Sequence, residues 1–113
     1  MKKILIFTAA LLSLPVAANA HPRLKAAGPP PGSVVAASPK ALRIQFNEPV
    51  ELLFSGVEVT NAKGEKQPTG TPVTSGADKT QMIVPLTISL SPGRYTVAWH
   101  AVGEGSYTFS IKK

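Results

Sequence analysis

His21 is the residue whose position most directly suggests chemistry. It follows the small residues 18–20 (Ala-Asn-Ala), which are typical of a signal-peptide cleavage site, so cleavage after Ala20 would make it the first residue. A first-position histidine offers an imidazole and an α-amine with a pKa of about 8. These two nitrogens, completed by an oxygen or a third nitrogen, form the tetragonal donor set that Cu(II) prefers. The alternative is a solvated terminal histidine that binds nothing.

Pro22 narrows the kind of chelate that His21 could form. Proline has no backbone N–H, so it cannot supply a deprotonated amide nitrogen as a ligand. A metal ion bound at this position would therefore depend on the α-amine and the imidazole ring.

The other reactive side chains argue against catalysis. The chain has no cysteine, two histidines and a single aspartate, Asp78. A Ser-His-acid triad needs a histidine between a nucleophile and a carboxylate, and the chain has no Gly-x-Ser-x-Gly turn, P-loop or dinucleotide fingerprint. The basic residues after position 20 are scattered rather than clustered, which disfavours nucleic-acid binding. We therefore expect a binding protein and not an enzyme.

Residues 1–20 have the organisation of a bacterial secretory signal peptide. Lys2 and Lys3 precede an apolar run at residues 4–14, which is too short to cross a bilayer as a helix. We expect residues 21–113 to form one exported domain in the periplasm, without membrane insertion. The absence of cysteine means that its core must be stable without disulfides.

Strands and turns are expected to position these groups throughout residues 21–113. Apolar and polar residues alternate over 42–46, 57–60, 95–101 and 107–111, and residues 82–86 form a shorter apolar run. Pro, Gly and Asn clusters separate these segments, and no helical periodicity is convincing. Six or seven short strands of this kind predict an all-β fold, either a β-sandwich or a small Greek-key barrel. Residues 66–80 are expected to form a surface loop that contains an edge strand.

Several motifs resemble those of the CopC family of periplasmic copper-resistance proteins. They are HPRL at 21–24, LRIQFNEPV at 42–50, FSGV at 54–57, LSPGRYTVAWHAV at 90–102 and GSYTF at 105–109. The resemblance covers essentially all of the chain after residue 20. It implies a Greek-key barrel of about seven strands, immunoglobulin-like or cupredoxin-like in shape. It also implies a Cu(II) site made by the first histidine together with an Asp and a His from the loop between the last two strands.

The chain departs from this family pattern at the metal-site loop, where only Gly103 and Glu104 stand in place of a longer segment. Glu104 is either an ordinary turn carboxylate or a substitute oxygen ligand. His100 is out of phase with the apolar residues of its strand, so it is either a surface residue or a second nitrogen ligand. The methionine-rich segment of some members is also missing, and Met82 is expected in the core. Copper is therefore expected as Cu(II) rather than Cu(I).

These observations predict a periplasmic copper carrier with His21 as its main ligand. Trp99 is expected in the core, where its fluorescence would be quenched by a nearby Cu(II) ion. The expected partners are the copper ion and an inner-membrane copper importer or another periplasmic copper protein. The alternative is a metal-free immunoglobulin-like interaction module that has lost the site. Copper-dependent oxidative catalysis is a third hypothesis, which is disfavoured because such an enzyme would need a second dependable ligand.

Overall fold

The computed structural model describes residues 23–75, 79–101 and 103–113. The expected signal peptide, His21 and Asp78 therefore lie outside the described residues. Within the described part of the chain, no helix is long and apolar enough to cross a membrane.

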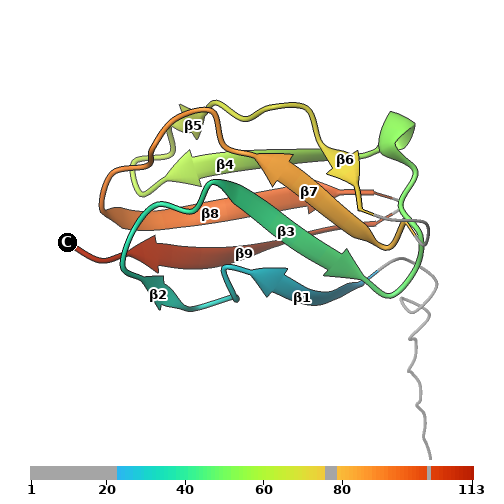
Figure 1. The fold of residues 1–113 in the computed structure, drawn as a ribbon, viewed down its shortest axis with the longest axis horizontal. Helices are drawn as coiled ribbons and strands as arrows, with labels where there is room; N and C mark the ends of the chain where they lie inside the picture. Colours follow the sequence, from blue (N-terminus) through green and yellow to red (C-terminus); the bar gives the residue numbers. More distant parts are fainter. Residues whose placement is uncertain (1–22, 76–78, 102) are drawn as a thin grey trace, which may run out of the picture.

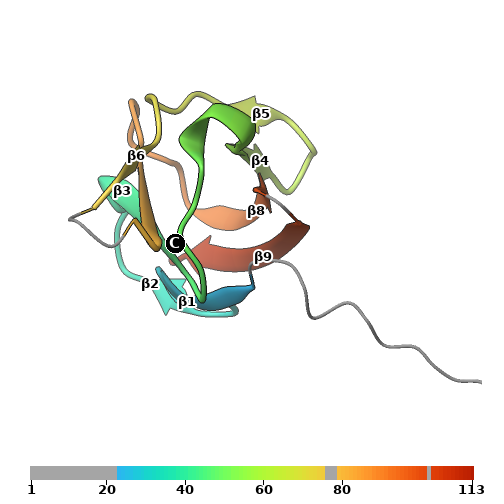
Figure 2. The same ribbon diagram turned by 90° about the vertical axis from the view of Figure 1, so that its right-hand side faces the viewer.

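Two β-sheets pack face to face, which confirms the predicted all-β fold and selects a sandwich (Figures 1 and 2). The four-stranded sheet has the order β1 (Leu24–Gly28), β3 (Ala41–Phe46), β7 (Gln81–Pro85) and β6 (Val73–Thr74). The five-stranded sheet has the order β2 (Val34–Val35), β9 (Glu104–Ile111), β8 (Gly93–His100), β4 (Gly56–Asn61) and β5 (Lys66–Gln67). All pairings are antiparallel except that of β2 with β9.

The described residues contain nine strands rather than about seven. Three of them, β2, β5 and β6, are only two residues long and lie at sheet edges. Two residues cannot show a period-two pattern, and the five-residue β1 (LKAAG) has little apolar alternation, so the sequence patterns predict neither β1 nor the positions of these three strands. The stretch from 66 to 80 contains two of these short edge strands, β5 and β6, where one edge strand was expected.

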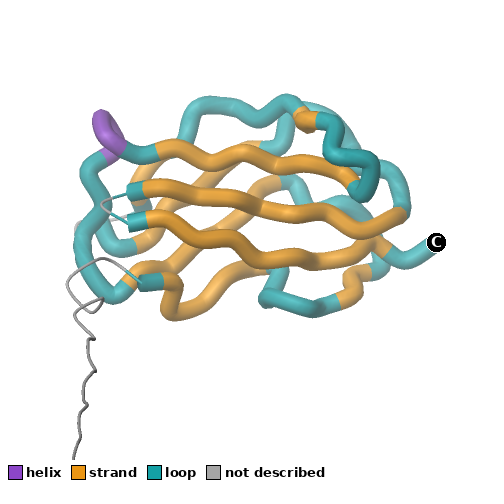
Figure 3. The backbone as a smooth tube through the Cα atoms, turned by 180° about the vertical axis from the view of Figure 1, so that it is seen from behind, coloured by secondary structure: helices purple, strands orange, loops and turns teal. Residues whose placement is uncertain are grey.

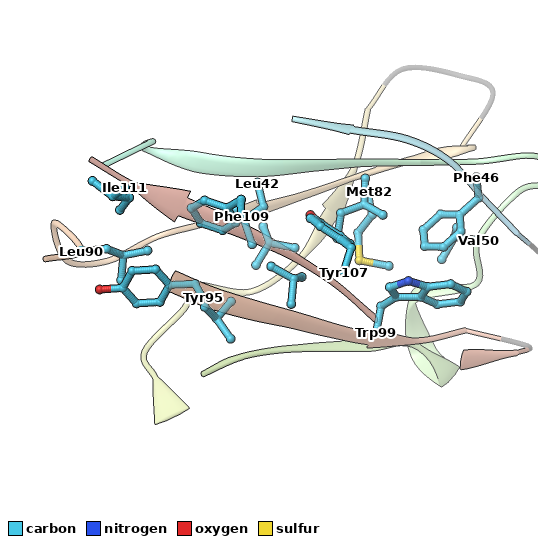
Figure 4. Close-up of a cluster of buried hydrophobic side chains, with 14 residues drawn as sticks. Leu42, Phe46, Val50, Met82, Leu90, Tyr95, Trp99, Tyr107, Phe109 and Ile111 are labelled. Carbon is cyan, nitrogen blue, oxygen red and sulfur yellow. The ribbon is translucent and has the colours of Figure 1, made fainter. Parts of the chain in front are cut away.

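The core lies between the sheets and is made by the inward-facing residues of the long strands (Figure 4). Alternate residues of β3, β8 and β9 are buried, as their apolar periodicity predicts. The buried hydrophobic core consists of Leu42, Ile44, Phe46, Val50, Val59, Met82, Val84, Leu90, Tyr95, Val97, Trp99, Tyr107, Phe109 and Ile111. Met82 is fully buried and Trp99 is 6% exposed, so both are core residues as expected.

One end of the sandwich gathers several strand termini. The end of β8 and the starts of β4 and β9 lie there, and the short 3-10 helix η3 (Leu52–Phe54) leads into β4 at the same end (Figures 1 and 3). The start of β1 reaches the same end, since Leu24 pairs with Phe46 at the end of β3 (Figure 1). His100 and Glu104, the candidate ligands among the described residues, lie at this end.

Candidate metal site

His100 and Glu104 are direct neighbours across the β8–β9 hairpin. The register pairs His100 with Glu104 on one side and with Gly56 of β4 on the other. Residues opposite each other in antiparallel strands share one face of the sheet, so all three lie on the outer face. The structure thus brings together the two candidate ligands that it describes.

The hairpin that joins these strands is short and closed by its own backbone. The N–H of Ala101 donates a hydrogen bond to the carbonyl oxygen of Gly103, with an N···O distance of 2.7 Å. This turn keeps the last residue of β8 directly beside the first residue of β9. The loop shortening noted in the sequence therefore brings a carboxylate to the histidine.

The imidazole of His100 lies against the backbone of Gly56. A Cβ atom built on Gly56 would lie 2.5 Å from Cε1, 3.2 Å from Nε2 and 3.3 Å from Nδ1 of that ring. The Cε1 edge of the ring, between the two nitrogens, therefore faces β4. Gly56 is not among the residues predicted for the site, although a glycine inside a strand often marks a close approach of this kind.

His100 and Glu104 are both exposed. Among the described residues, the single ion pair given by the structure joins Lys66 to Glu58 at 3.0 Å, so His100 and Glu104 do not form one. Both face an open depression of about 320 Å³. It is lined by Gly56, Val57, Glu58, Ala98, Trp99, His100, Glu104 and Gly105. An imidazole and a carboxylate at one small depression supply one nitrogen and one oxygen donor, a mixed set that suits Cu(II).

Trp99 lies on the opposite side of the same strand and points into the core. Its ring packs edge-on against Phe46, with ring centroids 4.9 Å apart. A Cβ on Gly105 would lie 2.7 Å from its Cζ2 atom, so the absence of a side chain at Gly105 makes room for the indole. The indole is therefore packed between Phe46 and Gly105, one residue from His100.

Two hydrogen bonds between Arg23 and Asn47 hold the chain shortly after the expected first residue. The N–H of Arg23 donates a hydrogen bond to Oδ1 of Asn47 at 2.8 Å, and the N–H of Asn47 donates to the carbonyl oxygen of Arg23 at 3.1 Å. His21 is three residues before Leu24, a distance that an extended chain spans in at most roughly 11 Å.

No cluster of three or more His, Cys, Asp or Glu side chains that could hold a metal ion occurs within residues 23–75, 79–101 and 103–113. The described chain therefore supplies two candidate ligands, His100 and Glu104, and any third protein ligand has to come from elsewhere. Met82 is fully buried between the sheets and is not available to an ion at the surface.

Comparison with known proteins agrees with the β-sandwich and its motifs. Residues 24–112 match the family model described as the CopC domain. This chain therefore belongs to the CopC family, as the motif resemblance predicts.

Relatives cover almost the whole chain. Protein YobA of Escherichia coli strain K12 is 41% identical over 113 residues, which cover 95% of this chain and 90% of YobA. Copper resistance protein C of Escherichia coli is 32% identical over 124 residues, covering 99% of this chain and 98% of the relative. The crystal structure of PcoC, a methionine-rich copper resistance protein from Escherichia coli, matches with a TM-score of 0.70 and 34% identity. That match covers 82% of this chain and all of the PcoC chain, yet this chain has only two methionines.

Proposed function

We propose that this chain is a periplasmic copper-binding protein that takes up Cu(II) through the α-amine and imidazole of His21 once residues 1–20 are removed. His100 and Glu104 are proposed as the additional nitrogen and oxygen ligands. The protein would act as a carrier or buffer and not as an enzyme. It would pass copper to an inner-membrane importer or to another periplasmic copper protein.

The observation that carries this proposal is the pairing of His100 with Glu104 at the end of the sandwich where β1 begins. Leu24 is linked to this pair through the core, since it pairs with Phe46, whose ring packs against Trp99 beside His100. His21 is three residues before Leu24, so chain length places it within roughly 11 Å of Leu24, at the start of β1.

The chemistry of the donors supports copper in the divalent state. An amine, two imidazoles and a carboxylate are the nitrogen and oxygen ligands typical of Cu(II), whereas Cu(I) favours thiolate and thioether ligands. The chain has no cysteine and its Met82 is buried. Without the loop Asp and His that the family resemblance implies, we expect weaker binding than in members with a complete site.

A metal-free interaction module is the second candidate, favoured by the presence of only two candidate ligands in the described residues. Titration of Cu(II) into protein that begins at His21 separates the two functions. The chain has one tryptophan, so its emission reports on Trp99 alone.

We expect stoichiometric quenching for the unmodified protein and an affinity at least about tenfold lower for His21→Ala, which is a loss of about 1.4 kcal/mol of binding free energy. His100→Ala and Glu104→Gln should each have a smaller effect. Identical weak responses from the unmodified protein and His21→Ala would contradict the copper function and favour the module.

A further inference from the structure

We infer that Gly56 is a positioning residue for His100: because Gly56 has no side chain, the Cε1 edge of the imidazole rests on β4, and this contact sets the direction of each ring nitrogen. This inference rests on the proposed function, in which His100 is a copper ligand. It adds Gly56 of β4, which lies within the FSGV motif at 54–57 but is not one of the predicted ligands.

The contact leaves no room for a side chain at position 56 unless the ring of His100 moves. A Cβ on Gly56 would lie 2.5 Å from Cε1 of His100, well inside the normal contact distance between carbon atoms of about 3.5–4.0 Å. The two ring nitrogens, at 3.2 and 3.3 Å from the same point, would also be crowded. Even alanine at position 56 would therefore force the ring to rotate away from β4.

The backbone does not explain why a glycine stands here. Positive φ angles occur at Gly32, Gly64 and Gly93 among the described glycines, and Gly56 is not one of them. Alanine can therefore adopt the backbone conformation of Gly56 without strain, and replacing a strand glycine reduces the entropy of the unfolded chain. The expected effect of Gly56→Ala is thus on the ring of His100 and not on the fold.

The neighbours of the ring make its orientation matter. Glu104 faces it from β9, and Glu58 lines the same depression from β4 while pairing with Lys66 at 3.0 Å. In this arrangement His100 forms no ion pair with Glu104 in the described structure, so neither donor is occupied by the other. A ring pushed off β4 has to move toward β9 or into solvent, and the mutual placement of the two donors is then lost.

The first arm of the test uses copper-free protein that begins at His21. Proton NMR should show a nuclear Overhauser effect between the α-protons of Gly56 and the Hε1 proton of His100 in the unmodified protein. In Gly56→Ala this proton should change its chemical shift, while the melting temperature stays the same or rises. Absence of the Overhauser effect in the unmodified protein would overturn the inference. It would leave the proposed binding of Cu(II) by His21 unaffected.

The second arm measures Cu(II) affinity and the electron paramagnetic resonance spectrum for four proteins: unmodified, Gly56→Ala, His100→Ala and the double variant. We expect Gly56→Ala to lower the affinity about as much as His100→Ala and to alter the nitrogen hyperfine pattern. In the His100→Ala background the second substitution should change nothing, since there is no ring to displace.

Two results of this arm would overturn the inference. In the first, Gly56→Ala leaves the affinity and the spectrum unchanged while His100→Ala weakens binding. This result would show that the contact of the His100 ring with Gly56 does not affect copper binding. Equal losses caused by Gly56→Ala with and without His100 would show that Gly56 acts on binding by another route. If His100→Ala itself leaves the affinity unchanged, the proposed ligand role of His100 is wrong. The NMR arm then still tests whether the His100 ring contacts Gly56.

Discussion

The indole of Trp99 lies over the backbone of Gly105, on the inner face of the same hairpin that carries His100 and Glu104 on its outer face. The two residues are directly opposite in the β8–β9 register, and a Cβ on Gly105 would lie 2.7 Å from Cζ2 and 3.2 Å from Nε1 of the indole. Each side of this hairpin therefore has a ring packed on a glycine. The core on one face and the candidate site on the other share the same two strands.

Gly105→Ala should destabilise the protein by about 1–3 kcal/mol, because the buried indole cannot move aside without disturbing its contact with Phe46. Urea unfolding followed by circular dichroism measures this change in the free energy of unfolding. Ser106→Ala is the matched control, since Ser106 is the next residue, is exposed, and should change the free energy by no more than about 0.5 kcal/mol. Equal effects of the two substitutions would contradict the packing described for Trp99.

Tyr107→Phe should leave the free energy of unfolding at neutral pH unchanged or higher. The Oη atom of Tyr107 is buried and has no hydrogen-bond partner within the described residues, and a buried unpaired hydroxyl costs about 1–3 kcal/mol. Urea unfolding near pH 7 measures the difference. A loss of more than about 1 kcal/mol in the Phe variant would mean that this hydroxyl makes a stabilising hydrogen bond.

Alkaline pH should separate the same two proteins further. Burial raises the pKa of Tyr107 from 10.0 to about 12, so the folded state keeps its proton where the unfolded state loses it. The titration of Tyr107 therefore leaves the free energy of unfolding of the unmodified protein unchanged below about pH 10. Between about pH 10 and 12 that free energy falls by about 1.4 kcal/mol per pH unit. Tyr107→Phe lacks this loss, so the difference in unfolding free energy between the two proteins should grow in its favour. A difference that stays constant with pH would exclude a raised pKa.

Met82→Leu should leave copper binding unchanged, because the Met82 side chain is fully buried between the sheets. The substitution nearly conserves volume and should cost less than about 1.5 kcal/mol of folding free energy. Competition with a coloured chelator, performed separately for Cu(II) and for Cu(I) under reducing conditions, measures the affinity. A large loss of Cu(I) affinity in this variant would show that Met82 is a ligand and that the core opens to admit the ion.

Strands β3, β8 and β9 were predictable because their burial depends on alternation, which is a local property of the sequence, whereas β1 lacks such alternation and was not predicted. Tyr95, Val97 and Trp99 are buried and His100 is exposed, as their phase along the strand requires. The edge strands β2, β5 and β6 were not predictable, because two paired residues leave no periodic signal. Their positions depend on which longer strands they pair with.

The candidate site was predictable only in part. His100 and Glu104 are close in the sequence, so a tight hairpin brings them together and their pairing follows from the turn. Gly56 lies far from both in the sequence, and its place beneath His100 is decided by the register between β4 and β8. Register is fixed by the packing of whole strands, which is why local patterns did not reveal this contact.

The central claim is that the free amine of His21 binds copper, and a single comparison of two proteins tests it. One protein begins at His21, and the other is identical except that its α-amine is selectively acetylated, so that the imidazole is kept while the amine can no longer bind. Cu(II) affinity is measured for both by quenching of Trp99 emission in the presence of a competing chelator. We predict a one-to-one complex for the first protein and an affinity at least about tenfold lower for the acetylated one. Equal affinities would contradict the proposed copper site.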